Sequence, residues 1–144
     1  MRTLIVGALA ALSLTAAPAA AQAGNAYAGT WAFQTEDYGN EDYSVIMSGV
    51  AVVTPASTPN RYRVQVLAQE SIVQNETGDS RLLVARENCH GETANGQLSI
   101  ECEMAEPLQG YEPDTFLLQT GEADRMVGVM SSATNAQVTF DRMR

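Results

Sequence analysis

Polar and apolar residues alternate one by one in several short segments of this chain. Residues 62–66 read Tyr-Arg-Val-Gln-Val, and segments 98–103 and 137–141 follow the same rule. A period of two residues is typical of a β-strand with one face on a core and the other in water. No segment fits the 3.6-residue period of a long amphipathic helix. The pattern therefore predicts an all-β protein.

Eight apolar-rich segments are separated by residues that favour turns, chiefly Gly, Pro, Asn and Asp. The predicted strands are 29–35, 43–54, 61–74, 81–90, 97–104, 115–121, 125–131 and 136–142. Regular strands with mostly short connections indicate an antiparallel barrel or sandwich. The length of 144 residues favours one domain, and the 45% of hydrophobic residues are enough for a core. We predict an eight-stranded antiparallel up-and-down β-barrel.

The dipeptide Asn95-Gly96 is the strongest hairpin signal in the chain, because a type I′ turn needs positive φ at both central positions. Around such a turn, opposed residues have numbers that sum to 191, and Cys89 and Cys102 satisfy this. They form a pair without mutual hydrogen bonds, in which side chains lie closest. We predict a disulfide that closes a 14-residue loop and contributes about 3 kcal/mol.

Other readings of the cysteines have less support. A metal site lacks ligands, because the chain has one His and no third Cys, and a CxxC redox motif is absent. In the same register His90 faces Glu101 on the side opposite the bridge. An exposed ion pair is favoured there over a general base or metal ligand.

Strand 81–90 follows the alternation less well. If Cys89 points inward, strict alternation also sends Glu87 inward. A buried unpaired carboxylate is costly, whereas a β-bulge moves the register by one residue. We favour the bulge, and the alternative is a buried or cavity-facing Glu87.

The N-terminus has the order of a secretory signal peptide. A positive start at Arg2 is followed by an apolar run over 4–14 and by small residues. The run is shorter than the roughly 20 residues of a membrane-spanning helix. We predict cleavage after Ala21, with Ala23 as the alternative.

Residues 1–21 are thus a signal peptide, 22–28 a short extension and 29–144 the barrel domain. The Ala-rich, Lys-free composition looks bacterial, so the expected compartment is periplasmic or extracellular.

The net charge of −9 becomes −10 once Arg2 is removed with the signal peptide. This balance argues against nucleic acid or an anionic membrane as the main partner. Polar residues at the outward positions Arg63, Gln65, Glu101 and Glu103 also argue against an outer-membrane barrel, whose outer face is apolar.

Gly29-Thr30-Trp31 resembles the G-x-W motif that opens the first strand of calycins, the superfamily of lipocalins and avidins. The resemblance implies that Trp31 plugs one end of an eight-stranded barrel and that Arg142 packs across it as a cation–π pair. The lipocalin motif before the seventh strand is absent, and a single Trp leaves no avidin-type aromatic box. Small periplasmic inhibitors of proteases and lysozyme are similar in size and compartment, but their inhibitory motifs are absent.

An enzyme is not expected, and we predict no catalytic residue, metal or cofactor. A nucleophilic triad would have to use His90, whose neighbour Cys89 is held in the bridge, and phosphate-binding Gly loops are absent. The acidic loop 36–42 has oxygens for Ca²⁺ but not the spacing of an EF-hand, so a solvated loop is favoured.

Two functions stay open: a carrier of a small apolar ligand, ranked slightly first, and a scaffold that binds a basic exported protein, for example as a hydrolase inhibitor. For the carrier, apolar residues of several strands are expected to face the ligand. They are Phe33, Tyr62, Val64, Ile100, Phe116, Met126 and Met130. For the scaffold, Tyr111 in the longest late connection is a candidate contact, although we favour a lid that closes the barrel end.

Overall fold

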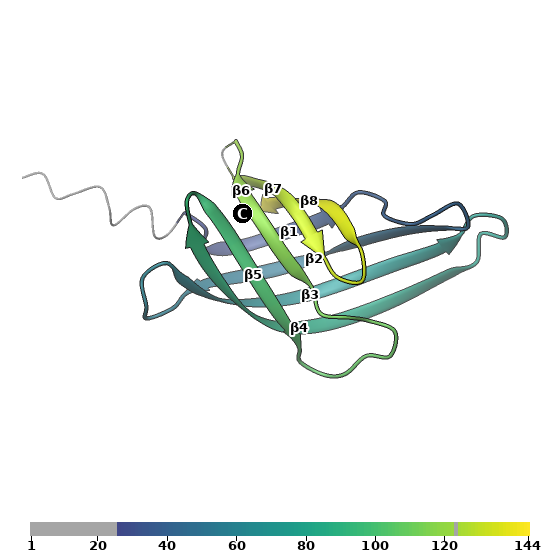
Figure 1. The fold of residues 1–144 in the computed structure, drawn as a ribbon, viewed down its shortest axis with the longest axis horizontal. Coiled ribbons are helices and arrows are strands. Elements are labelled where there is room, and N and C mark those ends of the chain that lie inside the picture. The colour runs from purple at the N-terminus through teal and green to yellow at the C-terminus, as the bar shows by residue number, and fades with distance from the viewer. Residues whose placement is uncertain (1–25, 123) are drawn as a thin grey trace, which may run out of the picture.

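The computed structural model describes residues 26–122 and 124–144 (Figure 1). The predicted signal peptide and both of its alternative cleavage sites lie outside the described residues. Within the described part of the chain, no helix is long and apolar enough to cross a bilayer.

The described residues form eight antiparallel strands that pair in chain order, and β8 pairs with β1 to close the barrel. The strands are β1 (Gly29–Thr35), β2 (Tyr43–Pro55), β3 (Arg61–Gln74), β4 (Ser80–Ala94), β5 (Gln97–Met104), β6 (Thr115–Thr120), β7 (Arg125–Ser131) and β8 (Asn135–Arg142). The predicted fold class is confirmed. β4 runs four residues further than predicted, because its pairing with β5 continues to the turn.

The strands of the barrel differ in length. β2, β3 and β4 have 13, 14 and 15 residues, whereas each of the other strands has between six and eight. The three long strands extend past the rest of the barrel as a sheet, which Figure 1 shows clearly. The two ends of the barrel are therefore built differently.

The turn between β4 and β5 has the predicted geometry. Asn95 and Gly96 have φ of 52° and 77°, so both central residues of the turn are left-handed. Cys89 is then paired with Cys102 in the ladder, with Cα atoms 4.0 Å apart, and the two residues form the disulfide. The hairpin prediction is confirmed in register and in its covalent bond.

The predicted bulge in β4 is wrong. β4 pairs with β3 without interruption from Ser80 to Glu92, and buried and exposed residues alternate strictly through Glu87 and Cys89. Glu87 consequently points inward and is only 2% exposed. The carboxylate occupies the buried position that the bulge was expected to avoid, because the structure supplies it with partners.

Candidate functional site

One end of the barrel is sealed around Trp31. This Trp31 end comprises the start of β1, the end of β8 and the β2–β3, β4–β5 and β6–β7 connections. Trp31 is 1% exposed, and its indole N–H donates to the carbonyl of Tyr27 at 2.9 Å. The guanidinium carbon of Arg142 lies 4.2 Å from the centroid of the Trp31 ring. The contact has the form that the calycin resemblance implies.

Arg142 also ties down the segment that leads into β1. Its two terminal nitrogens donate to the carbonyls of Ala28 and Ala26, both at 2.6 Å, and its Nε pairs with Asp124. A Cβ at Gly29, where φ is +139°, would lie 2.5 Å from the guanidinium. The glycine of the G-x-W motif is thus required by the close approach of Arg142 as well as by its φ.

Tyr27 lies in the predicted extension 22–28, yet it packs with the barrel. Its ring is buried, meets Tyr62 edge to face, and its hydroxyl donates to the carbonyl of Gly96 at 3.2 Å. An isolated aromatic before the first strand has no periodicity, so the sequence pattern did not identify this contact.

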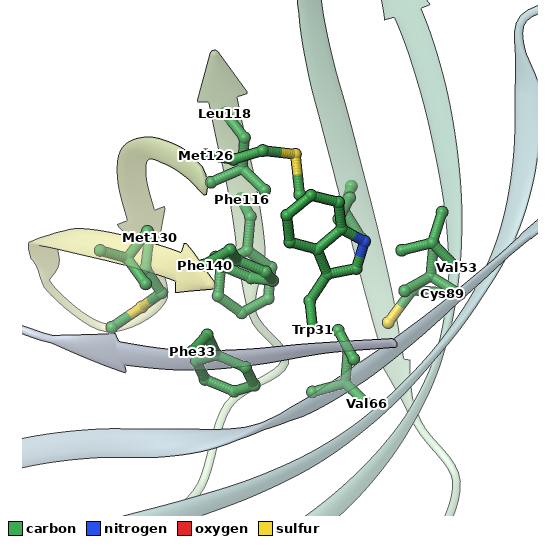
Figure 2. Packing of buried hydrophobic residues seen from close by; sticks show 14 of the residues in the cluster. Trp31, Phe33, Val53, Val66, Cys89, Phe116, Leu118, Met126, Met130 and Phe140 are labelled. Carbon is green, nitrogen blue, oxygen red and sulfur yellow. The ribbon is translucent and has the colours of Figure 1, made fainter. Parts of the chain in front are cut away.

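The interior next to Trp31 is filled with side chains (Figure 2). The rings of Phe33, Phe116 and Phe140 contact one another, with centroids 5.0–5.6 Å apart. All seven residues predicted to face a ligand are at most 3% exposed and belong to this packed cluster. They are Phe33, Tyr62, Val64, Ile100, Phe116, Met126 and Met130.

The opposite end is open and polar. This Tyr111 end comprises the β1–β2, β3–β4, β5–β6 and β7–β8 connections. It contains a hollow of about 400 Å³. The hollow is lined by Met47, Glu70, Gly110, Tyr111, Glu112, Ser132 and Ala133. None of the seven predicted ligand-facing residues lines this hollow.

The β5–β6 loop, residues 105–114, folds over this end with Tyr111 as its anchor. Tyr111 is half-buried, and its hydroxyl donates to Asp114 Oδ2 at 2.6 Å and lies 3.8 Å from the sulfur of Met47. This placement is that of a lid residue packed on the barrel, the favoured expectation. The same side chain still forms part of the wall of the hollow.

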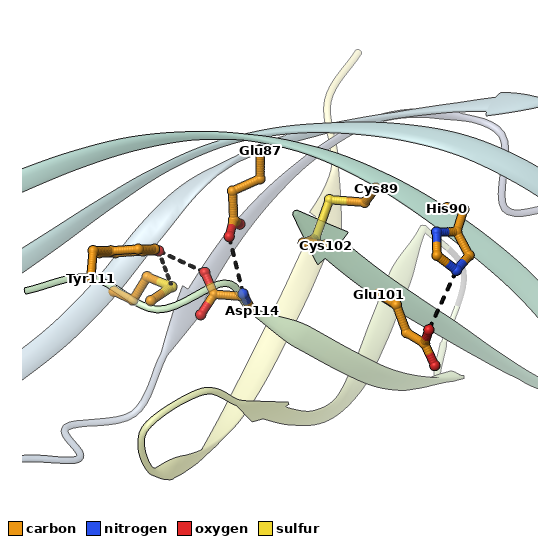
Figure 3. Close-up of a disulfide and its surroundings, with 8 residues drawn as sticks. Glu87, Cys89, His90, Glu101, Cys102, Tyr111 and Asp114 are labelled. Carbon is orange, nitrogen blue, oxygen red and sulfur yellow. Dashed lines mark hydrogen bonds and ion pairs between the residues drawn. A yellow bond between two sulfur atoms is a disulfide. The ribbon is translucent and has the colours of Figure 1, made fainter. Parts of the chain in front are cut away.

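Behind Tyr111, two carboxyl groups are buried together (Figure 3). Glu87 from β4 accepts the backbone N–H of Asp114 at 3.0 Å, and the carbonyl of Asp114 accepts from the backbone N–H of Cys102 at 3.1 Å. Asp114 is 0% exposed. The Glu87–Asp114 pair joins β4 to the residue that precedes β6.

Both carboxyl groups are shifted towards their protonated form. Burial raises the pKa of Glu87 to about 8, and the neighbouring charge of Asp114 adds to the rise. Burial likewise raises the pKa of Asp114 to about 6, although its hydrogen bond from Tyr111 acts in the opposite direction. Desolvation disfavours the charged form of any acid, and a second carboxylate in contact increases the effect.

A second tyrosine and carboxylate lie beside the pair. The hydroxyl of Tyr38, in the β1–β2 loop, donates to Glu70 Oε1 at 2.8 Å. Burial and this contact raise the pKa of Tyr38 above its ordinary value. The negative charge of Glu70 also raises the pKa of Asp114.

The remaining candidate groups do not line the hollow. His90 and Glu101 form an ion pair at 3.3 Å with side chains 61% and 66% exposed. In the acidic loop, Asp37 accepts the backbone N–H groups of Gly39 and Val45 and the hydroxyl of Ser44. These bonds lower the pKa of Asp37 and use its oxygens to shape the loop.

Among the described residues, one group of three metal-ligand side chains is close enough to hold an ion: Glu87, Cys89 and Cys102. Both sulfurs are in the disulfide and have no thiolate to offer. The group is therefore unsuited to a metal ion.

The fold and these two ends define a class: a closed eight-stranded antiparallel barrel with a disulfide, one sealed end and one open polar end. No protein-family model and no curated protein matches the sequence. A de novo designed fluorescence-activating β-barrel is similar in structure, with a TM-score of 0.57 and 14% identity over 84% of this chain and 97% of the design. That likeness supports the barrel fold, and membership of the calycins stays a prediction.

Proposed function

We propose that this protein is an exported, non-enzymatic β-barrel that binds a small molecule at its Tyr111 end. The observation that carries the proposal is the contrast between a packed interior and a hollow of about 400 Å³ at the open end. Ligand sites are concave and combine apolar walls with a few placed polar groups. The hollow offers both kinds of wall.

The lining favours a ligand with an apolar part and a donor or positively charged group. Met47 and the ring of Tyr111 supply apolar contact, whereas Glu70 and Glu112 supply carboxylates. The residues that line the hollow include no Arg or His. A purely apolar ligand would leave Glu70 beside it without a new partner, which is unfavourable.

Export is supported by the N-terminal pattern and by the disulfide, because such bonds persist in oxidising compartments. The designed barrel with a similar fold is described as fluorescence-activating. A barrel of eight strands has room for one small ligand where side chains leave space.

The test is native mass spectrometry of protein purified from its own compartment, compared with two variants of the β7–β8 turn. Ser132→Trp places a large ring in the hollow, whereas Thr134→Trp alters an exposed residue that does not line it. We expect a bound small molecule in the wild type and in Thr134→Trp, and its loss in Ser132→Trp. A ligand retained equally by all three would contradict this location.

The packed interior also favours the second function, a scaffold that binds a basic exported protein through its loops. In that case the purified chain is free of small molecules, and association with the partner weakens as salt rises. Exchanging Glu112, which is exposed on the β5–β6 loop, for Gln should then slow association. If the β7–β8 turn lies outside that interface, Thr134→Trp and Ser132→Trp should both leave association with the partner unchanged.

A further inference from the structure

The Glu87–Asp114 pair has more buried oxygen atoms than it has donors. Glu87 Oε1 accepts the Asp114 N–H, and Asp114 Oδ2 accepts the Tyr111 hydroxyl. Glu87 Oε2 and Asp114 Oδ1 are both buried, and no donor group reaches either one. An unsatisfied buried oxygen costs about 1–3 kcal/mol, and more if it is charged.

No cationic side chain neutralises the pair. The ion pairs among the described residues join Arg or His to other acids, none of them Glu87 or Asp114. A metal ion is also a poor fit, since the ligand group that contains Glu87 is completed by disulfide sulfurs. Glu87 Oε1 lies 3.0 Å from the backbone nitrogen of Asp114, so the two carboxyl groups are close, and each acts on the pKa of the other. One proton held between them satisfies both.

The groups that face the pair increase the need for that proton. Glu70 of β3 adds a negative charge, and Tyr38 of the β1–β2 loop donates its hydroxyl to Glu70 rather than to the pair. Tyr111 of the β5–β6 loop donates its hydroxyl to Asp114, whereas Ser132 of the β7–β8 turn donates its hydroxyl to the carbonyl of Glu112. From β5, the neighbour is the uncharged disulfide.

We propose that the Glu87–Asp114 pair is a proton-operated clasp that holds the β5–β6 loop over the Tyr111 end and releases it when the shared proton is lost. Glu87 is fixed within the continuous β3–β4–β5 ladder, whereas Asp114 stands at the junction of a ten-residue loop with β6. Repulsion between two carboxylates is therefore relieved by movement of the loop. Tyr111 moves with Asp114, because its hydroxyl is bonded to it.

The shared proton is retained in acid and lost from neutral to mildly alkaline pH, in line with the raised pKa values of both acids. Loss of Tyr111 from its place would enlarge the hollow that it lines. This regulatory role rests on the proposed binding function, but the opening of the loop is independent of any ligand. The clasp can thus be tested on the ligand-free chain.

The experiment is hydrogen–deuterium exchange of the full mature chain at pH 6 and pH 9, corrected for the intrinsic dependence of exchange on pH. Protection of the 105–114 loop should fall by about tenfold for each pH unit while the closed loop still holds the proton, and should level off once the proton is lost, whereas β2 and β3 stay protected. Glu87→Gln keeps a neutral hydrogen-bond donor at position 87 and should abolish the fall in loop protection between pH 6 and pH 9. Glu103→Gln removes the same charge from an exposed position of β5 and should behave as the wild type.

Equal loop protection at both pH values in the wild type would overturn the clasp, as would a fall in Glu87→Gln as large as in the wild type. If Glu87→Gln does not fold, carbon-13 NMR titration of the wild-type carboxyl groups decides. Coupled titration of Glu87 and Asp114 between pH 5 and 9 supports the clasp, and titration of both below pH 5 rejects it. If Ser132→Trp retains the small molecule, the proposed ligand site is wrong, but the exchange and titration results for the clasp are unaffected.

Discussion

The two ends of the barrel are closed by different interactions. At the Trp31 end a large aromatic ring fills the barrel, and Arg142 covers it with one cation–π contact and two short hydrogen bonds to backbone carbonyls. At the Tyr111 end the β5–β6 loop is held by the Tyr111 hydroxyl and by the contact between two acids, and the Tyr38 hydroxyl ties the β1–β2 loop to Glu70. The first closure is the same at every pH at which Arg stays charged, whereas the second depends on a proton.

The two kinds of closure suit different purposes: the Trp31 end stabilises the fold, and the Tyr111 end can open. A closure made of apolar packing and a permanent cation is costly to open, and it suits a structural plug. A closure made of hydrogen-bonded acids is weaker and responds to its surroundings. We expect substitutions at the Trp31 end to lower global stability most and substitutions at the Tyr111 end to change local opening most.

The largest expected effect is that of Trp31→Ala. It removes a fully buried indole together with its cation–π and hydrogen-bond partners, and should lower the free energy of unfolding by about 3–5 kcal/mol. Urea denaturation followed by circular dichroism measures the loss. Tyr111→Ala is the matched aromatic truncation at the other end and should cost clearly less; equal losses would remove the contrast between the ends.

Removal of the disulfide comes next. The double substitution Cys89→Ala and Cys102→Ala opens a loop with a sequence separation of 13 and should cost about 3 kcal/mol in the loop-entropy model. The same measurement on wild-type protein after reduction provides the comparison. A double variant as stable as the oxidised wild type would show that packing alone holds the hairpin.

Glu87→Gln should produce a smaller change that depends on pH. Because the folded-state pKa values of Glu87 and Asp114 are raised above their ordinary values, the folded chain binds more protons than the unfolded chain between about pH 4 and about pH 8. The stabilising contribution is therefore complete in acid and is lost as pH rises through this window. At pH 9 the variant should be more stable than the wild type by about 1–2 kcal/mol in urea denaturation.

The direction in which wild-type stability changes with pH distinguishes protonated acids from ionised ones. At pH 4, where both acids are protonated in the wild type, the variant should have no advantage. Wild-type stability that instead rises from pH 5 to pH 9, with Glu103→Gln unchanged from it, would show that the acids are stabilised as anions.

Tyr111→Phe tests the hydrogen bond that anchors the β5–β6 loop, and its expected effect on stability is smaller. The hydroxyl donates to Asp114, and its loss should cost about 1 kcal/mol. The hydrogen bond lowers the pKa of Asp114, so its removal should raise that pKa further. Carbon-13 NMR titration of Asp114 measures the shift, and an unchanged titration would contradict the contact.

The smallest effect is expected for His90→Ala. His90 and Glu101 lie on the outer face with more than half of each side chain exposed, and such pairs contribute about 0–1 kcal/mol. Stability and binding should both stay close to wild type in urea denaturation and native mass spectrometry. A large loss of binding would move the functional site to the outer face of β4 and β5.

The fold was predictable from the sequence because several independent local signals agree. Strict alternation sets which residues face inward, Asn95-Gly96 sets the turn, and the spacing of Cys89 and Cys102 fits only one register. The resemblance to the calycin G-x-W motif led to Trp31 and Arg142, which contact each other in the structure.

The Tyr111 end was not predictable in the same way. The alternation did send Glu87 inward, but its partner Asp114 lies 27 residues further along, at the end of a loop without periodicity. The sequence favours a bulge because it does not reveal that a backbone N–H and a second carboxyl group meet this acid. The seven residues predicted to face a ligand do point inward, but they pack against one another and are not accessible to a ligand.

The pairing of β1 with β8 has a consequence for the order of assembly. Gly29–Thr35 precedes the other described strands in the chain, and its second neighbour is the last of them, β8. During synthesis β1 therefore has one unpaired edge until β8 has been made, and an unpaired edge can join a strand of another molecule. Arg142, which completes both the ladder and the cover of Trp31, converts the open sheet into a barrel, so premature truncation before β8 should favour aggregation.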